Sequence, residues 1–158
     1  MRHNKLIDIK LSSPLLRLPG FASADIISLA SRNLLRSLTF NLPSGQRVAH
    51  AMRLQPLGPD VFAELKNYKV NFENSTPLWF YILKEAEVQQ MGLRLGEVGG
   101  RIVTEVFVGL IEGDNTSYLD QNPFWKPVLP CWESYRNNKH FTIADLTRIA
   151  EGIVPVVF

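Results

Sequence analysis

The side chains that most often carry catalysis or bind metals are sparse in this sequence of 158 residues. Its three histidines, His3, His50 and His140, lie far apart, and none pairs with Cys, Asp or Glu at the short spacing of a metal site. We therefore expect all three to be surface residues. The single cysteine, Cys131, follows Pro130 and has no histidine near it in sequence, which favours a buried structural thiol.

A glycine cluster and three glutamates are the next candidates for chemistry. Residues 93–101, LRLGEVGGR, precede a predicted helix and suggest a phosphate cradle, but their spacing fits neither the dinucleotide-binding nor the Walker pattern. Close helix packing is the favoured interpretation. Glu85 and Glu87 are expected on a solvated helix face. Glu105 lies within an apolar helix, where an ion pair with Arg101 four positions earlier accounts for it.

An asparagine interrupts the most informative apolar pattern. At about 100° per residue, a helix within the stretch 28–46 puts Asn33 inside a broad apolar arc, with Arg36 one turn further on at the border. A buried amide without a partner costs about 1–3 kcal/mol, so Asn33 should have a hydrogen-bonding partner. The apolar residues of the arc are Ile26, Leu29, Ala30, Leu34 and Leu38.

Composition and charge favour a soluble globular protein. The length permits one domain with a hydrophobic core, predicted to span residues 1–158. The net charge is only +2, and no basic stripe alternates with aromatic residues, so we expect no nucleic-acid partner. A single cysteine excludes an internal disulfide and fits a reducing compartment, which favours a soluble, cytoplasmic protein.

No segment of the sequence has the pattern of a signal peptide or a membrane span. The first ten residues, MRHNKLIDIK, contain no apolar signal core. The longest nearly apolar run, 98–111, is interrupted by Arg101, Thr104 and Glu105 and is too short to cross a bilayer. We therefore expect neither in this chain.

Helical periodicity and breaker residues predict a mainly α fold with several helices joined by long ordered loops. Residues 6–9 could form a brief strand or an extended lead-in, and 11–20 and 115–140 are predicted loops. The helix after residue 96 is expected to be central, because apolar residues cover most of its circumference. Helices are predicted from Ser23 or Asp25 to about 38, over 45–53, over 61–68 after Asp60, over 78–91 after Thr76 and Pro77, over 97–111, and over 143–151 after Thr142.

Several of these segments together resemble a known family. Residues 7–20, IDIKLSSPLLRLPG, and 28–52, SLASRNLLRSLTFNLPSGQRVAHAM, look like a late segment of the peroxidase–cyclooxygenase superfamily, the animal-type haem peroxidases, and are closest to its bacterial branch. TPLWFYILKEAEV, RLGEVGGRIVTEVFVGLIEGDNTSYLD, NPFWKPVLP and FTIADLTRIA agree with it in the same order. The resemblance covers residues from about 7 to 150 and implies a partial haem-peroxidase fold.

The resemblance implies haem b as the cofactor of the parent family and hydrogen peroxide-dependent oxidation of a donor as its activity. In these enzymes a proximal histidine ligates the iron, and an asparagine late in the chain accepts a hydrogen bond from its free ring N–H. The position that matches this asparagine is Asn33. The arginine three residues on matches Arg36, which the resemblance assigns to a haem propionate.

The family's two histidines and its distal arginine precede the segment that this chain matches. His3 has neither the surrounding motif nor the right distance from residues 7–13 to be the proximal histidine. We therefore expect no catalytic residue and no iron ligand in this chain, no tight haem binding by the chain alone, and no activity by itself. Haem would bind only with a complementary N-terminal half.

Two kinds of function stay open on this basis. The chain is either the C-terminal part of a haem peroxidase (truncated, split, or one half of a bipartite peroxidase or fatty-acid dioxygenase) or a helical interaction module that kept the fold and lost the haem. An apolar face made for another half would favour self-association. An independent enzyme is disfavoured, because no nucleophile–base pair or metal set is visible.

Overall fold

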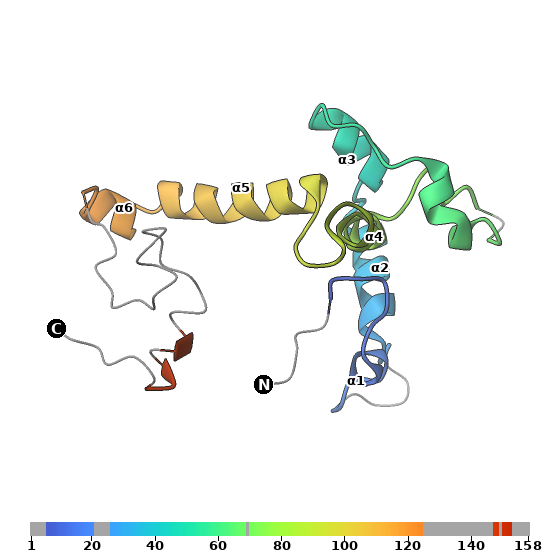
Figure 1. Cartoon of the computed structure of the whole chain (residues 1–158), viewed down its shortest axis with the longest axis horizontal. Helices are drawn as coiled ribbons and strands as arrows, with labels where there is room; N and C mark the ends of the chain where they lie inside the picture. Colours follow the sequence, from blue (N-terminus) through green and yellow to red (C-terminus); the bar gives the residue numbers. More distant parts are fainter. Residues whose placement is uncertain (1–5, 21–25, 69, 125–146, 149, 153–158) are drawn as a thin grey trace. The chain divides into compact units, whose positions relative to one another are not determined.

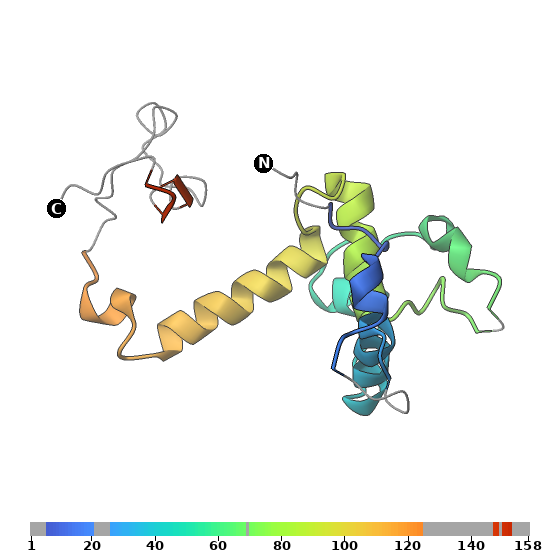
Figure 2. The same cartoon turned by 90° about the horizontal axis from the view of Figure 1, so that it is seen from below.

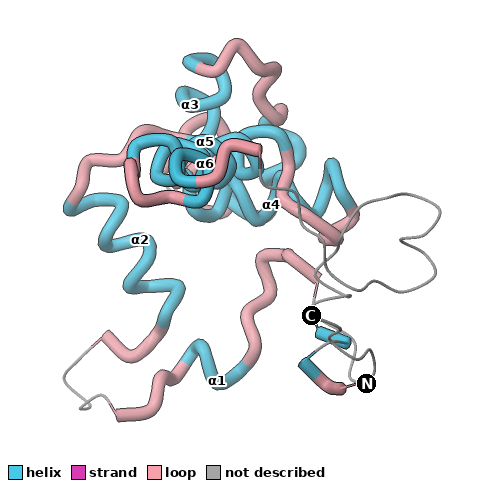
Figure 3. The backbone as a smooth tube through the Cα atoms, turned by 90° about the vertical axis from the view of Figure 1, so that its left-hand side faces the viewer, coloured by secondary structure: helices cyan, strands magenta, loops and turns pink. Residues whose placement is uncertain are grey.

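The computed structural model of the chain describes residues 6–20, 26–68, 70–124, 147–148 and 150–152. Within these ranges the chain consists of helices and loops, without a strand, which confirms the predicted mainly α class (Figure 3). None of the helices in these ranges is both long enough and apolar enough to span a membrane. The chain forms two compact units, Met1–Val108 and Gly109–Phe158. A single domain over 1–158 stays a prediction.

The first unit is built around α4 (Leu78–Gln90), which packs against α2 (Leu29–Thr39) and α3 (Gly45–Ala51) (Figure 1). The single turn α1 (Ser13–Leu16) lies beside α2 (Figure 2). Its other helices are the 3₁₀ helix η1 (Pro59–Leu65), which follows α3, and the first part of α5 (Glu97–Gly113). The second unit contains the end of α5 and the short helix α6 (Tyr118–Gln121).

Serine side chains cap α2, which carries Asn33 and Arg36, and α3, the helix that follows it. Ser28 accepts a hydrogen bond from the backbone N–H of Ser31 at the start of α2, over 3.4 Å, and Ser44 caps α3 as predicted. The predicted start of the first long helix is wrong, because residues 26–28 are not helical. Ser23 and Asp25, the expected caps, lie outside the described residues.

Two further predicted caps are wrong. Asp60 lies in the first turn of η1, which begins at Pro59, and its carboxylate pairs with Lys66 over 3.2 Å. Thr76 is fully buried, and its hydroxyl donates to the carbonyl oxygen of Phe72, over 2.8 Å, instead of capping α4. Both side chains instead bond a residue four to six positions away, Lys66 for Asp60 and Phe72 for Thr76.

Near the two ends of the chain the structure tests the predictions only in part. Residues 7–9 form bends rather than a strand, and the Ile7 N–H donates to the carbonyl of Gly92 over 2.8 Å. The predicted loops over 11–20 and 115–140 contain the short helices α1 and α6. Of the last predicted helix, residues 147, 148 and 150 are helical, whereas Thr142 lies outside the described residues.

The core of the first unit forms around Tyr81, a buried residue of α4. Its ring stacks on Phe62 of η1, with 5.7 Å between the ring centroids. Its hydroxyl accepts a hydrogen bond from the backbone N–H of Leu57 over 2.9 Å. A side chain at Gly45 of α3 would overlap the Tyr81 ring, so glycine is what lets the two helices approach. Burial raises the pKa of the Tyr81 phenol, and the negative charge of Glu85 adds to this effect.

Helix α5 begins on a buried carboxylate supplied by α4. Glu85 is 1% exposed, and its two oxygens accept hydrogen bonds from the N–H groups of Val98 and Gly99, each over 3.0 Å. The first N–H groups of a helix have no partner within the helix and carry a partial positive charge, so an anion there is stabilised. The predicted solvated position of Glu85 is therefore wrong. The prediction failed because the start of α5, which buries Glu85, lies more than ten residues further along the sequence.

Two glycines of the cluster permit this close contact. A Cβ at Gly96 would lie 2.6 Å from Cδ of Glu85, and one at Gly99 would lie 2.6 Å from Cγ2 of Ile82. The favoured interpretation of the cluster as a packing device is confirmed. The place that a phosphate would take at this helix end is filled by the carboxylate of Glu85.

Beyond its first turn, α5 is not central in the part of the chain that the structure describes. Val98 and Gly99 are buried and Ile102 is half-buried, but Val106 and Phe107 are more than half exposed. The prediction of a central helix is wrong here because periodicity records which side chains are apolar and not which surface covers them.

Replacing Glu85 with Gln should lower the free energy of unfolding by about 2 kcal/mol, because a neutral amide accepts weaker hydrogen bonds and turns an N–H₂ donor toward the α5 amides. Urea unfolding followed by circular dichroism measures the loss. The matched control is Glu87→Gln, since Glu87 is half-buried on the same helix and pairs with Lys84 over 3.4 Å. The control should cost less than about 1 kcal/mol. Equal losses in the two variants would contradict the role given to Glu85.

Replacing the adjacent residues Gly99 and Gly100 with alanine, one at a time, should change the free energy of unfolding in opposite directions. Gly99→Ala should lower the unfolding free energy by about 1–2 kcal/mol, because the new methyl group overlaps Ile82. Gly100→Ala should raise it by up to about 1 kcal/mol, because the nearest atom, Cβ of Leu95, is 4.0 Å away and alanine favours the helix. Thermal denaturation should rank Gly100→Ala above wild type and Gly99→Ala below it. The reverse order would show that the glycine contact does not exist.

Candidate functional site

Asn33 and Arg36 lie one turn apart on α2 and contact each other. Nη2 of Arg36 donates a hydrogen bond to Oδ1 of Asn33 over 3.0 Å. Arg36 is exposed and Asn33 is half-buried, and no residue of α2 is fully buried. The expectation of a fully buried amide is therefore wrong, because α2 is only partly covered by the described chain. The partner that the amide finds is its own neighbour on the helix.

Only some residues of the apolar arc predicted for α2 face another part of the protein, and the others face solvent. Leu34 and Leu38 face a hollow shared with α4, whereas Ile26 precedes the helix and is about half exposed. Asn33 lies on the helix between Leu29 and Ser37, and the Ser37 hydroxyl donates to the Asn33 carbonyl oxygen over 3.1 Å. Because Asn33 is also half-buried, it lies at the edge of the covered side of α2.

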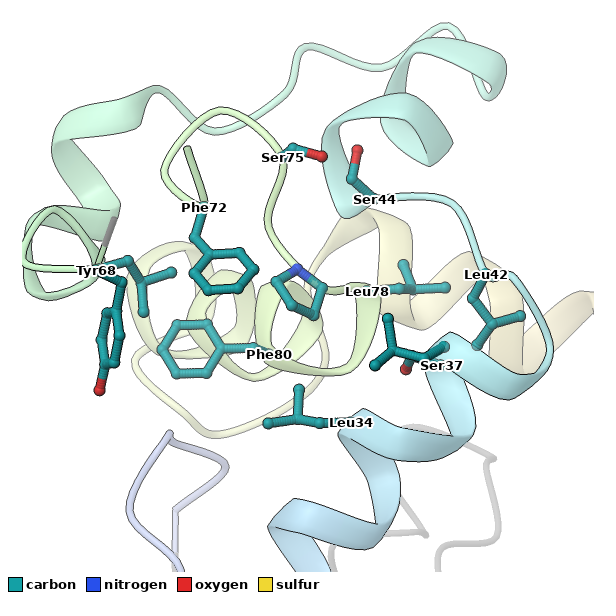
Figure 4. A pocket seen from close by; sticks show the side chains of 12 residues that line it. Leu34, Ser37, Leu42, Ser44, Tyr68, Phe72, Ser75, Leu78 and Phe80 are labelled. Carbon is teal, nitrogen blue, oxygen red and sulfur yellow. The ribbon is translucent and has the colours of Figure 1, made fainter. Parts of the chain in front are cut away.

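The hollow beside α2 is an apolar pocket of about 480 Å³, which we call the α2–α4 pocket (Figure 4). Three aromatic rings, five leucines, a proline and three serines surround it, and none of the residues that line it is charged. They come from α2, the α2–α3 connection, the end of η1, the loop between η1 and α4, and the first turn of α4. These residues are Leu34, Ser37, Leu38, Leu42, Ser44, Leu65, Tyr68, Phe72, Ser75, Pro77, Leu78 and Phe80.

Hydrogen bonds to the buried Thr76 attach the wall of the α2–α4 pocket to α3. The Gln46 side-chain amide donates to Oγ1 of Thr76 over 2.8 Å and accepts from the backbone N–H of Thr76 over 2.9 Å. The N–H of Gly45 donates to the Thr76 carbonyl oxygen, also over 2.9 Å. Thr76 is fully buried and Gln46 is half-buried, so these bonds are partly shielded from water, and together they tie Thr76 to α3.

A second hollow, of about 400 Å³, lies beside Arg36 on α2. Nε of Arg32 donates to the carbonyl oxygen of Ile26 over 2.7 Å at its edge. The hollow therefore combines apolar surface with two guanidinium groups. Its lining residues are Ile26, Arg32, Leu35, Arg36 and Thr39.

The other sequence-predicted candidates do not join either hollow. His50 is exposed on α3, as predicted, whereas His3, His140 and Cys131 lie outside the described residues. Nε of Arg101 contacts Oε1 of Glu105 over 2.6 Å, which confirms the predicted ion pair. Among the described residues, no three His, Cys, Asp or Glu side chains cluster where they could hold a metal ion.

No protein-family model, no curated protein and no solved structure matches this chain. Its chemistry is therefore read from its own side chains. They offer the hydrogen-bonded side chains of Asn33 and Arg36 on α2, and an uncharged pocket lined by other residues of the same helix. Sequence reasoning missed the pocket, because its lining comes from segments up to 46 residues apart. Its only local signals were single serines among apolar residues, such as Ser37 and Ser44.

The Asn33–Arg36 contact should contribute little to folding. Asn33→Ala and Arg36→Ala should each change the free energy of unfolding by less than about 1 kcal/mol, because a hydrogen bond open to water exchanges with solvent at little cost. Thr76→Val is the positive control and should cost about 1–3 kcal/mol, since it leaves buried partners unpaired. Urea titration measures all three variants. A loss at Asn33 as large as that at Thr76 would make the amide a structural residue.

Proposed function

We propose that α2 forms part of the wall of a haem site in a peroxidase-like protein, and that the iron ligand and the distal residues come from polypeptide outside this sequence. The family resemblance motivates the proposal. The observation that carries it is the placement of an amide and an exposed guanidinium one turn apart on a helix that the described chain leaves partly uncovered.

The residues present fit the group that the proposal requires. Oδ1 of Asn33 has two lone pairs and uses one for Arg36, so it can accept a second hydrogen bond from an imidazole N–H. The exposed guanidinium of Arg36 carries five N–H donors and suits a carboxylate. The hollow beside it adds Leu35 and Arg32, a combination that suits an apolar ring bearing carboxylate groups.

Each residue would do a limited and definable task. Haem, when bound, supplies the redox chemistry of peroxide reduction. Asn33 would accept a hydrogen bond from the free ring N–H of the histidine that ligates the iron, which would orient that imidazole and raise its basicity. Arg36 would neutralise a propionate and fix the orientation of the ring edge. The general acid and base would come from the polypeptide that brings the histidines.

A helical interaction module is the second candidate, and the exposed side of α5 favours it. Val103, Val106 and Phe107 are each more than two-fifths exposed on that helix. Apolar side chains gathered on one side of a helix are typical of a surface that binds another protein. The two candidates differ in whether Asn33 and Arg36 affect the binding of haem.

The test titrates the chain with haemin in the presence of imidazole, which supplies the axial nitrogen in trans, and follows the Soret band. Haemin alone should bind weakly and without fixed stoichiometry. With imidazole, wild type should bind about fivefold more tightly than Asn33→Ala or Arg36→Ala, as expected for about 1 kcal/mol per lost hydrogen bond. The effect of Arg36→Ala should vanish with haemin dimethyl ester, which has no free carboxylate.

Arg47→Ala is the matched control, because Arg47 is an exposed arginine on α3. It should leave both titrations unchanged. Identical curves for wild type, Asn33→Ala and Arg36→Ala would overturn the haem proposal and favour the interaction module. Sequencing the genomic region upstream gives an independent check, since a reading frame there should encode a glycine–histidine motif and a distal histidine.

A further inference from the structure

We propose that the α2–α4 pocket is a binding site for a small, neutral, apolar molecule that carries an aromatic ring and one hydrogen-bonding oxygen. The site lies on the side of α2 that bears Leu34 and Leu38, and it shares no lining residue with the hollow beside Arg36. The inference stands apart from the haem proposal, because it uses neither Asn33 nor Arg36.

The size and lining of the pocket define the class of ligand. A volume of about 480 Å³ falls within the range of cavities that enclose small organic molecules. No residue that lines it is charged, so a ligand with a formal charge would lose its hydration without gaining a partner. The rings of Phe72 and Phe80 stand together on one side of the pocket (Figure 4). They offer flat surfaces on which an aromatic ring packs well.

Serine hydroxyls give the pocket a polar end. Figure 4 shows the hydroxyls of Ser44 and Ser75 near each other, away from the Phe80 ring. Oγ of Ser44 accepts the N–H of Arg47 over 3.4 Å as the cap of α3, so its own O–H is left to donate. A ketone, phenol or alcohol oxygen placed at this end would meet that donor while the ring of the ligand packs toward Phe72 and Phe80.

The pocket is held in shape before any ligand binds. The loop that carries Phe72 and Ser75 is tied to α3 by the hydrogen bonds between Gln46 and Thr76, and the Ser75 N–H donates to the Asn71 carbonyl over 3.1 Å. A wall fixed by its own hydrogen bonds does not have to be ordered by the ligand, which lowers the entropic cost of binding. A small molecule suits such a fixed hollow better than a flat protein surface does.

The experiment titrates the whole chain with N-phenyl-1-naphthylamine, a neutral aromatic probe whose fluorescence rises in apolar surroundings. Wild type should bind it saturably at one site. Two competitors of equal shape then test the ligand class at pH 7.5. Neutral 1-naphthol should displace the probe at least tenfold better than anionic 1-naphthoate, because the pocket offers no cation. Equal displacement by the two would overturn the assignment to neutral ligands.

Substitutions on α2 locate the site. Leu34→Glu places a carboxylate in the pocket and should weaken probe binding at least tenfold. Leu38→Glu puts a negative charge at the open edge of the pocket, where the residue is 77% exposed, so the fold should tolerate it while probe binding weakens in the same direction. Leu35→Glu is the matched control, because this exposed neighbour of Leu34 does not line the pocket, and it should change the dissociation constant less than twofold.

Three outcomes would overturn the proposal. The first is the absence of saturable probe binding by the folded wild-type chain. The second is an equal loss of binding in Leu34→Glu and Leu35→Glu. The third is a wild-type dimer in analytical ultracentrifugation that Leu34→Glu converts to a monomer, which would make the pocket a contact between two copies. The haemin titrations with Asn33 and Arg36 variants are unaffected by these results, so the two proposals can fail separately.

Discussion

The structure of the first unit depends on a buried carboxylate placed at a helix end. Glu85 is supplied by α4 and accepts two N–H groups from the first turn of α5, so the two helices share one electrostatic contact in the core. A carboxylate sealed from water is costly unless its oxygens are paired, and the start of a helix is one of the few surfaces that can pair both at once. Gly96 and Gly99 have no side chain, which lets the backbone at the start of α5 approach Glu85 and Ile82 of α4.

A second buried polar contact shapes the face on which function is proposed. Gln46 and Thr76 exchange hydrogen bonds across thirty positions of sequence, and the loop before α4 takes its form from them. This loop and α2 then enclose the α2–α4 pocket, while the other side of α2 presents Arg36. One short helix therefore separates an uncharged hollow from a cationic one, and the two can recognise different chemistry.

Much of the secondary structure was predictable, because it follows from local signals. Ser44 capped α3 as expected, and α4 ends at Gln90, one residue before the predicted Met91, because the backbone turns left-handed at Met91 and Gly92. Two of the failures share one cause. Thr76 and Glu85 carry polar groups that looked local or solvated, yet each is buried against a distant segment. Helical periodicity assigns a side chain to a face but says nothing about what the rest of the chain brings to that face.

The sequence by itself determined the helical class and the one-turn spacing of Asn33 and Arg36 on α2, since both depend on residues within a few turns of one another. Only the tertiary structure decided that Glu85 would be the anion at the start of α5, that Asn33 would be half-buried, and that Leu34 would line a pocket. These outcomes require segments far apart in the chain to meet, and their meeting depends on shape and burial that no local pattern encodes.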